Sequence, residues 1–182
     1  TELLKSVSLF WDLKDEELGY IADKMISKKF ENGNLIFLEE SEGENLFFVV
    51  EGSVKITRLS KDGREVILAM LNAGDFFGEM SLLDGEARSA NVIALENTEV
   101  LILNRHDFLE VLHNYPQIAI QLLKEMTSRL RKSDRQIVSL SLSDAEKRTA
   151  LCIIRFADEQ GTIKNGQVTV PKIPIQQDIA NM

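Results

Sequence analysis

The chain has 182 residues, of which 44% are hydrophobic and 27% are charged, a composition typical of a soluble globular protein with one or two domains. It has no apolar run near the roughly 20 residues that span a bilayer and no signal-peptide pattern, which predicts a cytoplasmic protein with no membrane partner. The net charge of −8 is uneven, with −11 on residues 1–120 and +3 on residues 121–182, so only the second part favours contact with nucleic acid.

The residue types that serve catalysis or bind metals are scarce. The single cysteine, Cys152, lies in an apolar helical pattern, so the chain can form no internal disulfide and no cysteine-ligated cluster. The two histidines, His106 and His113, lie seven residues apart on a predicted helix, where we expect surface positions and no metal site. With no nucleophile–base pair and no Gly-rich hydrolytic loop, we expect no catalytic residues and no enzyme.

Hydrophobic residues at three- and four-residue spacing predict helix over residues 3–26. From Lys28 the pattern changes, and glycines recur every 9 to 11 residues from Gly33 to Gly85. The short β-rich runs between and after them predict strands at residues 35–38, 46–50, 53–59, 65–71, 91–95 and 99–103. The spacing indicates an α+β protein whose first part is a double-sheet jelly roll. Metal-dependent cupin enzymes share that frame, but this chain lacks their ligand histidines.

A segment between two predicted strands, residues 74–90, carries the candidate site. A helical turn that opens at Gly78 would present unpaired backbone N–H groups to an anion. Arg88 adds a guanidinium suited to a phosphate, Ser89 a hydroxyl donor, and Glu79 a carboxylate that can accept from sugar hydroxyls. The alternative is a surface ion pair between Arg88 and Glu79 on a turn-rich barrel.

The run from Phe77-Gly78-Glu79 to Arg88-Ser89-Ala90 closely resembles the phosphate-binding cassette of cyclic-nucleotide-binding domains. The resemblance implies that Glu79 binds the ribose 2′-hydroxyl and that Arg88 and Ser89 bind the cyclic phosphate, beside the backbone of Gly78 and Ala90. It covers residues 1–115, which we expect to form the effector domain.

A second helical pattern follows a short helix that Pro116 ends. Residues 116–141 present an a/d seam with spacings of 3 and 4, formed by Leu123, Met126, Leu130, Ser133, Ile137 and Leu140. A seam of this length predicts a parallel homodimer, the alternative being that this face packs on the chain's own barrel.

The polar Ser133 on this seam needs a hydrogen-bond partner, which its own preceding turn or a ligand can supply. The region is similar to regulators of the catabolite-activator type, in which a Thr-Ser pair on the dimer helix reads the adenine. Here the pair is Ser133-Asp134, with Arg129 one turn earlier. The resemblance therefore implies base contacts from these three residues, and Asp134 departs from the pattern.

Residues 142–182 are predicted to start with a capping box at Ser143, followed by a helix, a hairpin over 161–170 and the start of a helix at Ile173. This order is similar to the opening of the winged helix-turn-helix in the same regulators. Its recognition helix is absent from this sequence, and position 1 is not Met, so we expect a piece of a longer protein.

The leading hypothesis is a bacterial transcription regulator of the cyclic-AMP receptor protein (Crp-Fnr) family, with cyclic AMP as effector rather than cofactor. The resemblance implies double-stranded DNA and RNA polymerase as partners. Alternatives are a family member with another effector or none, the regulatory domain of an ion channel or kinase, and an enzyme.

Overall fold

The computed structural model describes residues 4–5, 7–142, 145–164, 167–170 and 179 of the chain. It divides into two compact units, residues 1–125 and 126–182. Among the described residues, no helix combines the length and hydropathy that a membrane crossing requires.

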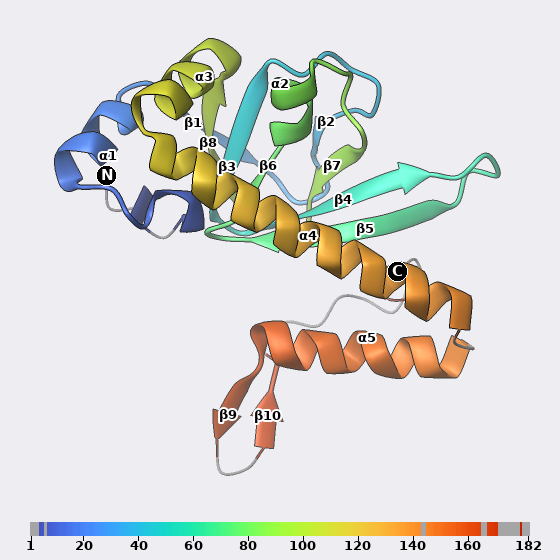
Figure 1. Cartoon of the computed structure of the whole chain (residues 1–182). Helices are drawn as coiled ribbons and strands as arrows, with labels where there is room; N and C mark the ends of the chain where they lie inside the picture. Colours follow the sequence, from blue (N-terminus) through green and yellow to red (C-terminus); the bar gives the residue numbers. More distant parts are fainter. Residues whose placement is uncertain (1–3, 6, 143–144, 165–166, 171–178, 180–182) are drawn as a thin grey trace. The chain divides into compact units, whose positions relative to one another are not determined.

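The first unit contains two four-stranded antiparallel sheets (Figure 1). One has the order β1-β8-β3-β6, with strands Ile26–Phe30, Thr98–Asn104, Asn45–Glu51 and Phe76–Phe77. The other has the order β2-β7-β4-β5, with strands Leu35–Phe37, Asn91–Ala94, Ser53–Leu59 and Glu65–Asn72. Strands distant in sequence are neighbours in both sheets, as in a double-sheet jelly roll, and the predicted fold class is confirmed.

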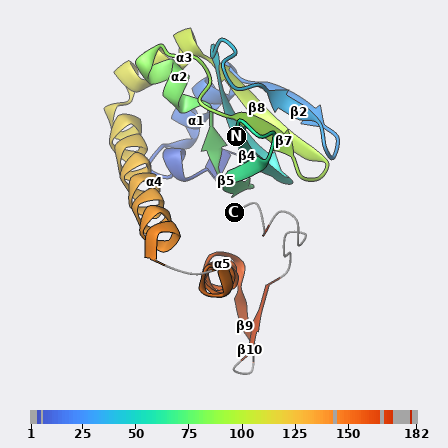
Figure 2. The same ribbon diagram turned by 90° about the vertical axis from the view of Figure 1, so that its right-hand side faces the viewer.

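Helices of the first unit lie at the ends of these strands. The six-residue helix α2, Glu79–Asp84, follows β6, and α3, Arg105–Asn114, follows β8 directly. Figures 1 and 2 both show α2 and α3 at the same end of the first unit. Tyr115 leaves the helical conformation, and Pro116 then opens α4, Pro116–Leu142, at a position where its missing N–H costs nothing.

The predicted helix over residues 3–26 is wrong in extent. The structure has a 3₁₀ turn at Ser8–Phe10 and a separate helix α1 at Asp15–Ala22. Lys14 between them is extended, with ψ of 158°, and its backbone N–H donates to the Glu17 carboxylate at 2.7 Å. This local cap starts a new helix and therefore interrupts the pattern that the hydrophobic spacing suggested.

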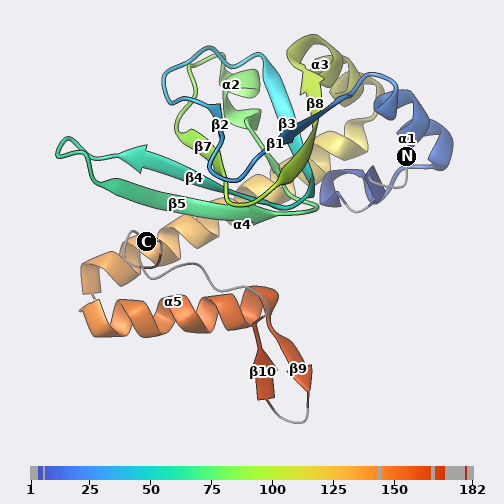
Figure 3. The ribbon, with the colours of Figure 1, turned by 180° about the vertical axis from the view of Figure 1, so that it is seen from behind.

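The second unit contains the rest of α4, the helix α5 at Ala145–Gln160, and an antiparallel hairpin of β9, Thr162–Lys164, and β10, Gln167–Thr169 (Figure 3). The predicted helix and hairpin are therefore present. The capping residues 143–144, the turn residues 165–166 and, apart from residue 179, the helix predicted to start at Ile173 lie outside the described residues.

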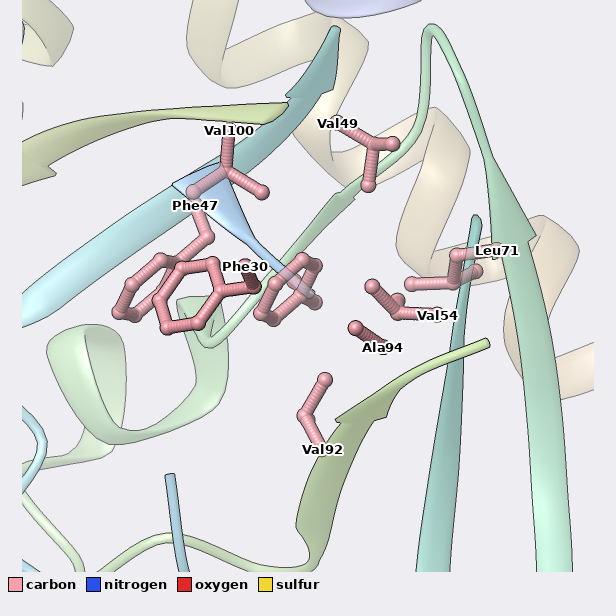
Figure 4. Packing of buried hydrophobic residues seen from close by; sticks show 9 residues of the cluster. Phe30, Phe47, Val49, Val54, Leu71, Val92, Ala94 and Val100 are labelled. Carbon is pink, nitrogen blue, oxygen red and sulfur yellow. The ribbon is translucent and has the colours of Figure 1, made fainter. Parts of the chain in front are cut away.

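The core of the first unit joins side chains from both sheets (Figure 4). Its buried residues are Phe30, Phe47, Val49, Val54, Leu71, Phe77, Val92, Ala94 and Val100. Phe47 and Phe77 stack with centroids 5.1 Å apart, while Phe48, the next residue on β3, packs 5.2 Å from Phe10 on the other side. Because β3 is buried on both faces, its sequence is a continuous apolar run rather than an alternating one.

Candidate anion-binding site

The segment singled out in the sequence forms a strand, a short helix and a return to the next strand. Gly78 lies between β6 and α2 with φ of +85°, and Gly85 ends the helix with φ of +77°. Both values are left-handed, which glycine adopts without the steric cost of a Cβ. These two glycines therefore define the start and end of the predicted helical turn, which is confirmed.

Arg88 reaches back from the end of this segment to its beginning. Its Nη1 donates to the Gly78 carbonyl at 2.8 Å, and its Nη2 donates to the Asn45 carbonyl on β3 at 2.7 Å. The residue is only 4% exposed. Its Nε is buried and, among the described residues, has no hydrogen-bond acceptor. A charged donor left in this state is costly, and the binding of an anion beside it would satisfy it.

The surroundings of Arg88 combine aromatic rings and carboxylates. The guanidinium carbon lies 4.2 Å from the centroid of Phe37 and 5.7 Å from that of Phe47. Burial lowers the pKa of Arg88 below its ordinary value, and the charges of Glu79 and Glu44 act in the opposite direction. Arginine stays protonated under such a shift, so the segment holds a buried cation.

A surface ion pair between Arg88 and Glu79 was the alternative for these residues, and its surface location is wrong. Glu79 is 4% exposed, the same fraction as Arg88. Two buried ionisable groups of opposite charge in one segment are uncommon in a purely structural turn. The burial favours a role in binding over a solvated contact.

The other predicted residues of the segment differ in their exposure to solvent. Ala90 is buried and Ser89 is exposed. The Ser89 hydroxyl donates to the sulfur of Met80 at 3.6 Å, a weak bond that a better acceptor can replace. The structure thus brings Gly78 and Arg88 into direct contact and leaves Ser89 accessible.

The loop between β2 and β3 completes the surroundings, although no functional motif in the sequence pointed to it. The Glu40 N–H donates to the Arg88 carbonyl at 2.8 Å, and the Arg88 N–H donates to the Ser41 carbonyl at 2.9 Å. A Cβ added to Gly43 would lie 2.3 Å from Ser81 Cβ and 3.1 Å from Arg88 Nε. Gly43 was noted only as one of the evenly spaced glycines, yet this close approach is what requires a glycine there.

The remaining predicted binding residues belong to the second unit. Arg129 is partly exposed, and Ser133 and Asp134 are exposed on α4. Their predicted contact with a base remains a prediction.

The predicted dimer face can be described residue by residue. Leu123, Leu130 and Ile137 are 67%, 62% and 61% exposed. Met126 is partly exposed and Ser133 is exposed, while the side chain of Leu140 lies outside the described residues. In contrast, Ile118 and Leu122 earlier on α4 are buried.

A group of possible metal ligands occurs on α3, where the sequence predicted surface histidines and no metal site. His106, Asp107 and Glu110 place one ligand atom each within 4.8 Å of one another. However, the Lys24 ammonium lies 2.9 Å from Asp107 and 3.0 Å from Glu110. The lysine cation is thus already paired with both carboxylates that a metal ion would need, and His106 is exposed.

Comparison with known proteins first defines the class of domain that contains the site. Residues 27–115 match the family model of the cyclic nucleotide-binding domain. That range contains both sheets except one residue of β1, together with α2, Arg88 and α3.

Full-length relatives then define the family. The chain is 35% identical over 153 residues to the cyclic AMP receptor protein of Thermus thermophilus, covering 84% of this chain and 71% of the relative. It is 26% identical over 181 residues to the CRP-like cAMP-activated global transcriptional regulator of Mycobacterium tuberculosis, covering 100% and 81%. The crystal structure of the Thermus thermophilus catabolite activator protein matches with a TM-score of 0.68 at 34% identity, covering 84% and 71%. The chain belongs to the cyclic AMP receptor protein (Crp-Fnr) family of transcription regulators.

Proposed function

We propose that this protein is a transcription regulator that binds cyclic AMP at Arg88 and couples occupancy of that site to DNA binding. The observation that carries the proposal is the buried Arg88 Nε, which has no acceptor within the described part of the chain. A cyclic phosphate carries one negative charge and presents oxygens of the kind that this donor needs. The match of residues 27–115 to the cyclic nucleotide-binding domain supports the same assignment.

Within this site each residue has a distinct role. The carbonyls of Gly78 and Asn45 orient the guanidinium, so that Nε and the remaining Nη hydrogens can bind the cyclic phosphate. The buried Glu79 carboxylate accepts from the ribose 2′-hydroxyl, and the exposed Ser89 exchanges its bond to Met80 for one to a phosphate oxygen. The backbone of Ala90 lies beside the phosphate.

The base is read from α4. Ser133 keeps a hydroxyl for hydrogen bonding to the purine, and Arg129 lies one turn earlier on the same helix. Asp134 accepts hydrogen bonds but cannot donate them when ionised, so it favours a base that presents an N–H donor. Adenine presents one amino group and guanine presents an amino group beside a ring N–H, so Asp134 can distinguish the two bases by the donors that it meets.

The active species is a homodimer formed through α4, which extends over 27 residues. Three large apolar side chains of the seam are more than 60% exposed, which supports burial against a second copy. Residues 116–141 form the dimer helix, residues 1–115 the effector domain, and residues 142–182 the first part of a winged helix. DNA is bound by that last part, and RNA polymerase is the partner at the promoter.

A regulator that uses this scaffold with another effector is the second candidate, and Asp134 is the residue that favours it. Calorimetric titration with cyclic AMP and cyclic GMP distinguishes the two candidates. The regulatory domain of a channel or kinase is less well supported, because the two regulator relatives align over 71% and 81% of their own length.

The decisive variant is Arg88→Leu, which removes the buried cation and keeps apolar bulk. Loss of a charged partner in a buried site costs on the order of 2–5 kcal/mol, so cyclic AMP affinity should fall by a factor of at least about 30. Arg64→Leu, which changes an exposed arginine on the β4–β5 hairpin, should bind like the wild type. Equal affinity of Arg88→Leu and wild type would contradict the proposal.

A further inference from the structure

Arg88 and Arg105 bind the same two segments of the first unit. Arg88 contacts the carbonyls of Asn45 and Gly78. The backbone N–H of Arg105 donates to the Glu44 carbonyl at 2.9 Å, and its side-chain Nε donates to the Leu82 carbonyl at 3.2 Å. One segment is thus residues 44–45 and the other is the stretch from Gly78 through α2.

Both contacts of Arg105 satisfy groups that helix geometry leaves unpaired. Arg105 is the first residue of α3, where backbone N–H groups have no partner within the helix. Leu82 lies in the last turn of α2, where carbonyls lack a partner and where a positive charge is favourable. A single residue therefore joins the start of α3 to the end of α2 and to the loop before β3.

The Leu82 contact is supported by rigid packing. Leu82 is completely buried, so its carbonyl cannot move without the core of the first unit. Asn45 pairs with Asn104 as the last register of the β3–β8 ladder, and the Arg105 bond to Glu44 extends that ladder by one residue. Figures 1 and 2 show both α2 and α3 at the same end of the sheets.

We infer that Arg105 is a positioning residue that transmits occupancy of the Arg88 site to α3. When an anion binds Arg88 Nε, it adds a contact to a guanidinium that is already bonded to Asn45 and Gly78. Any resulting shift of these two segments reaches Arg105 by both of its bonds and so reaches the first turn of α3. Because only Tyr115 separates α3 from α4, this is also the route toward the dimer helix. The inference rests on the proposed function, since it needs a ligand at Arg88.

Hydrogen exchange of α3 amides, with and without saturating cyclic AMP, tests this link in the full chain. Arg105→Met keeps a long unbranched side chain and removes the donor, while Arg105→Lys restores a donor at its end. Arg64→Met is the matched control, because the Arg64 side chain is exposed and its guanidinium pairs with Asp62 on the same hairpin, away from Arg88. Calorimetry on each variant confirms that cyclic AMP saturates the site during the exchange measurement.

The expected result is a cyclic-AMP-dependent change of α3 exchange in the wild type and in Arg64→Met. Arg105→Met should bind cyclic AMP and lose most of that change, and Arg105→Lys should recover part of it. If Arg105 merely stabilised the fold, its replacement by methionine would raise exchange equally with and without nucleotide and leave the nucleotide-dependent change intact.

An intact nucleotide-dependent change of α3 exchange in Arg105→Met, with cyclic AMP binding confirmed, would overturn this inference and leave the proposed function standing. Absence of cyclic AMP binding by the wild type would overturn the proposed function and this inference with it.

Discussion

The guanidinium carbon of Arg88 lies 4.2 Å from the centre of the Phe37 ring. Phe37 also packs 5.5 Å from Phe47 and 5.8 Å from Phe77, so the ring that faces the buried cation is fixed by the core. An aromatic face attracts a cation, and it offers no hydrogen-bond acceptor strong enough to compete with a phosphate. The site is thus built to hold the arginine without satisfying its Nε.

Replacing Phe37 by leucine should weaken cyclic AMP binding. The change keeps an apolar side chain but removes the ring, and a desolvated cation–π contact contributes about 0.5–2 kcal/mol, or about 2- to 30-fold in affinity. Phe30→Leu is the matched control, since Phe30 belongs to the core cluster against which Phe37 packs and its own cation contact is with Lys28. Both variants should lower the unfolding midpoint, whereas only Phe37→Leu should change the calorimetric Kd. An equal effect of both on Kd would argue against a specific role for the ring.

Gly43→Ala should reduce affinity by disturbing Ser81 and Arg88. The added methyl would lie 2.6 Å from the Ser81 Oγ, and overpacking of this kind costs typically about 1–3 kcal/mol. We expect cyclic AMP affinity to fall about tenfold and Ser81→Gly in the same chain to recover part of the loss. Gly19→Ala is the control, because a Cβ there meets no atom within 4 Å and the helix position favours alanine. Wild-type affinity of Gly43→Ala would show that the loop does not need its close approach.

Lys24 should make stability depend on pH in the acid range. The Lys24 ammonium lowers the pKa of Asp107 below its ordinary 3.8, and the Tyr20 hydroxyl together with Lys24 lowers the pKa of Glu110 below 4.5. A lowered folded-state pKa stabilises the fold above the ordinary pKa, and that stability is lost as the pH falls through the lowered value.

Urea midpoints from pH 7 to pH 2 measure this effect in the wild type and in Lys24→Met. The two proteins should differ most at pH 7 and converge toward pH 2, where both carboxyls are protonated. A constant difference over the whole range would mean that Lys24 acts through packing instead of charge.

Leu130→Gln should weaken the dimer. Leu130 is 62% exposed in the single chain, and burial of a leucine contributes about 1.5–3 kcal/mol. Because a symmetric dimer loses this contribution twice, its dissociation constant should rise at least about hundredfold. Arg131→Gln, one position off the seam, is the control for sedimentation measurements. If Leu130→Gln stayed dimeric down to the concentration at which the wild type dissociates, the dimer interface would lie elsewhere.

The sequence alone was sufficient to predict the strands that are separated by glycines. The strand predicted at 53–59 matches β4, because alternation and bounding turns both mark it. Two strands were not predicted. Of the five residues of β1, only Phe30 is buried, since the strand lies at a sheet edge, and β6 has only two residues, too few for any periodic pattern.

The candidate site was predictable in its side chains and not in its geometry. Residues such as Glu79 and Arg88 form a recognisable pattern because their chemistry depends on residue type. The acceptors that orient Arg88 are backbone carbonyls of Gly78 and Asn45, and a carbonyl exists at every position, so no sequence signal distinguishes them. The same holds for Arg105, whose bonds to Glu44 and Leu82 also use main-chain acceptors.

The central claim is that the buried Nε–H of Arg88 binds the phosphate of a cyclic nucleotide. The most direct measurement is the ¹H–¹⁵N resonance of the arginine Nε–H groups during titration with cyclic AMP, assigned to Arg88 by its absence in Arg88→Leu. We predict a downfield proton shift of this resonance and slower solvent exchange at saturation, as a charge-assisted hydrogen bond forms. An Arg88 Nε–H resonance that does not respond while calorimetry shows bound nucleotide would contradict the account.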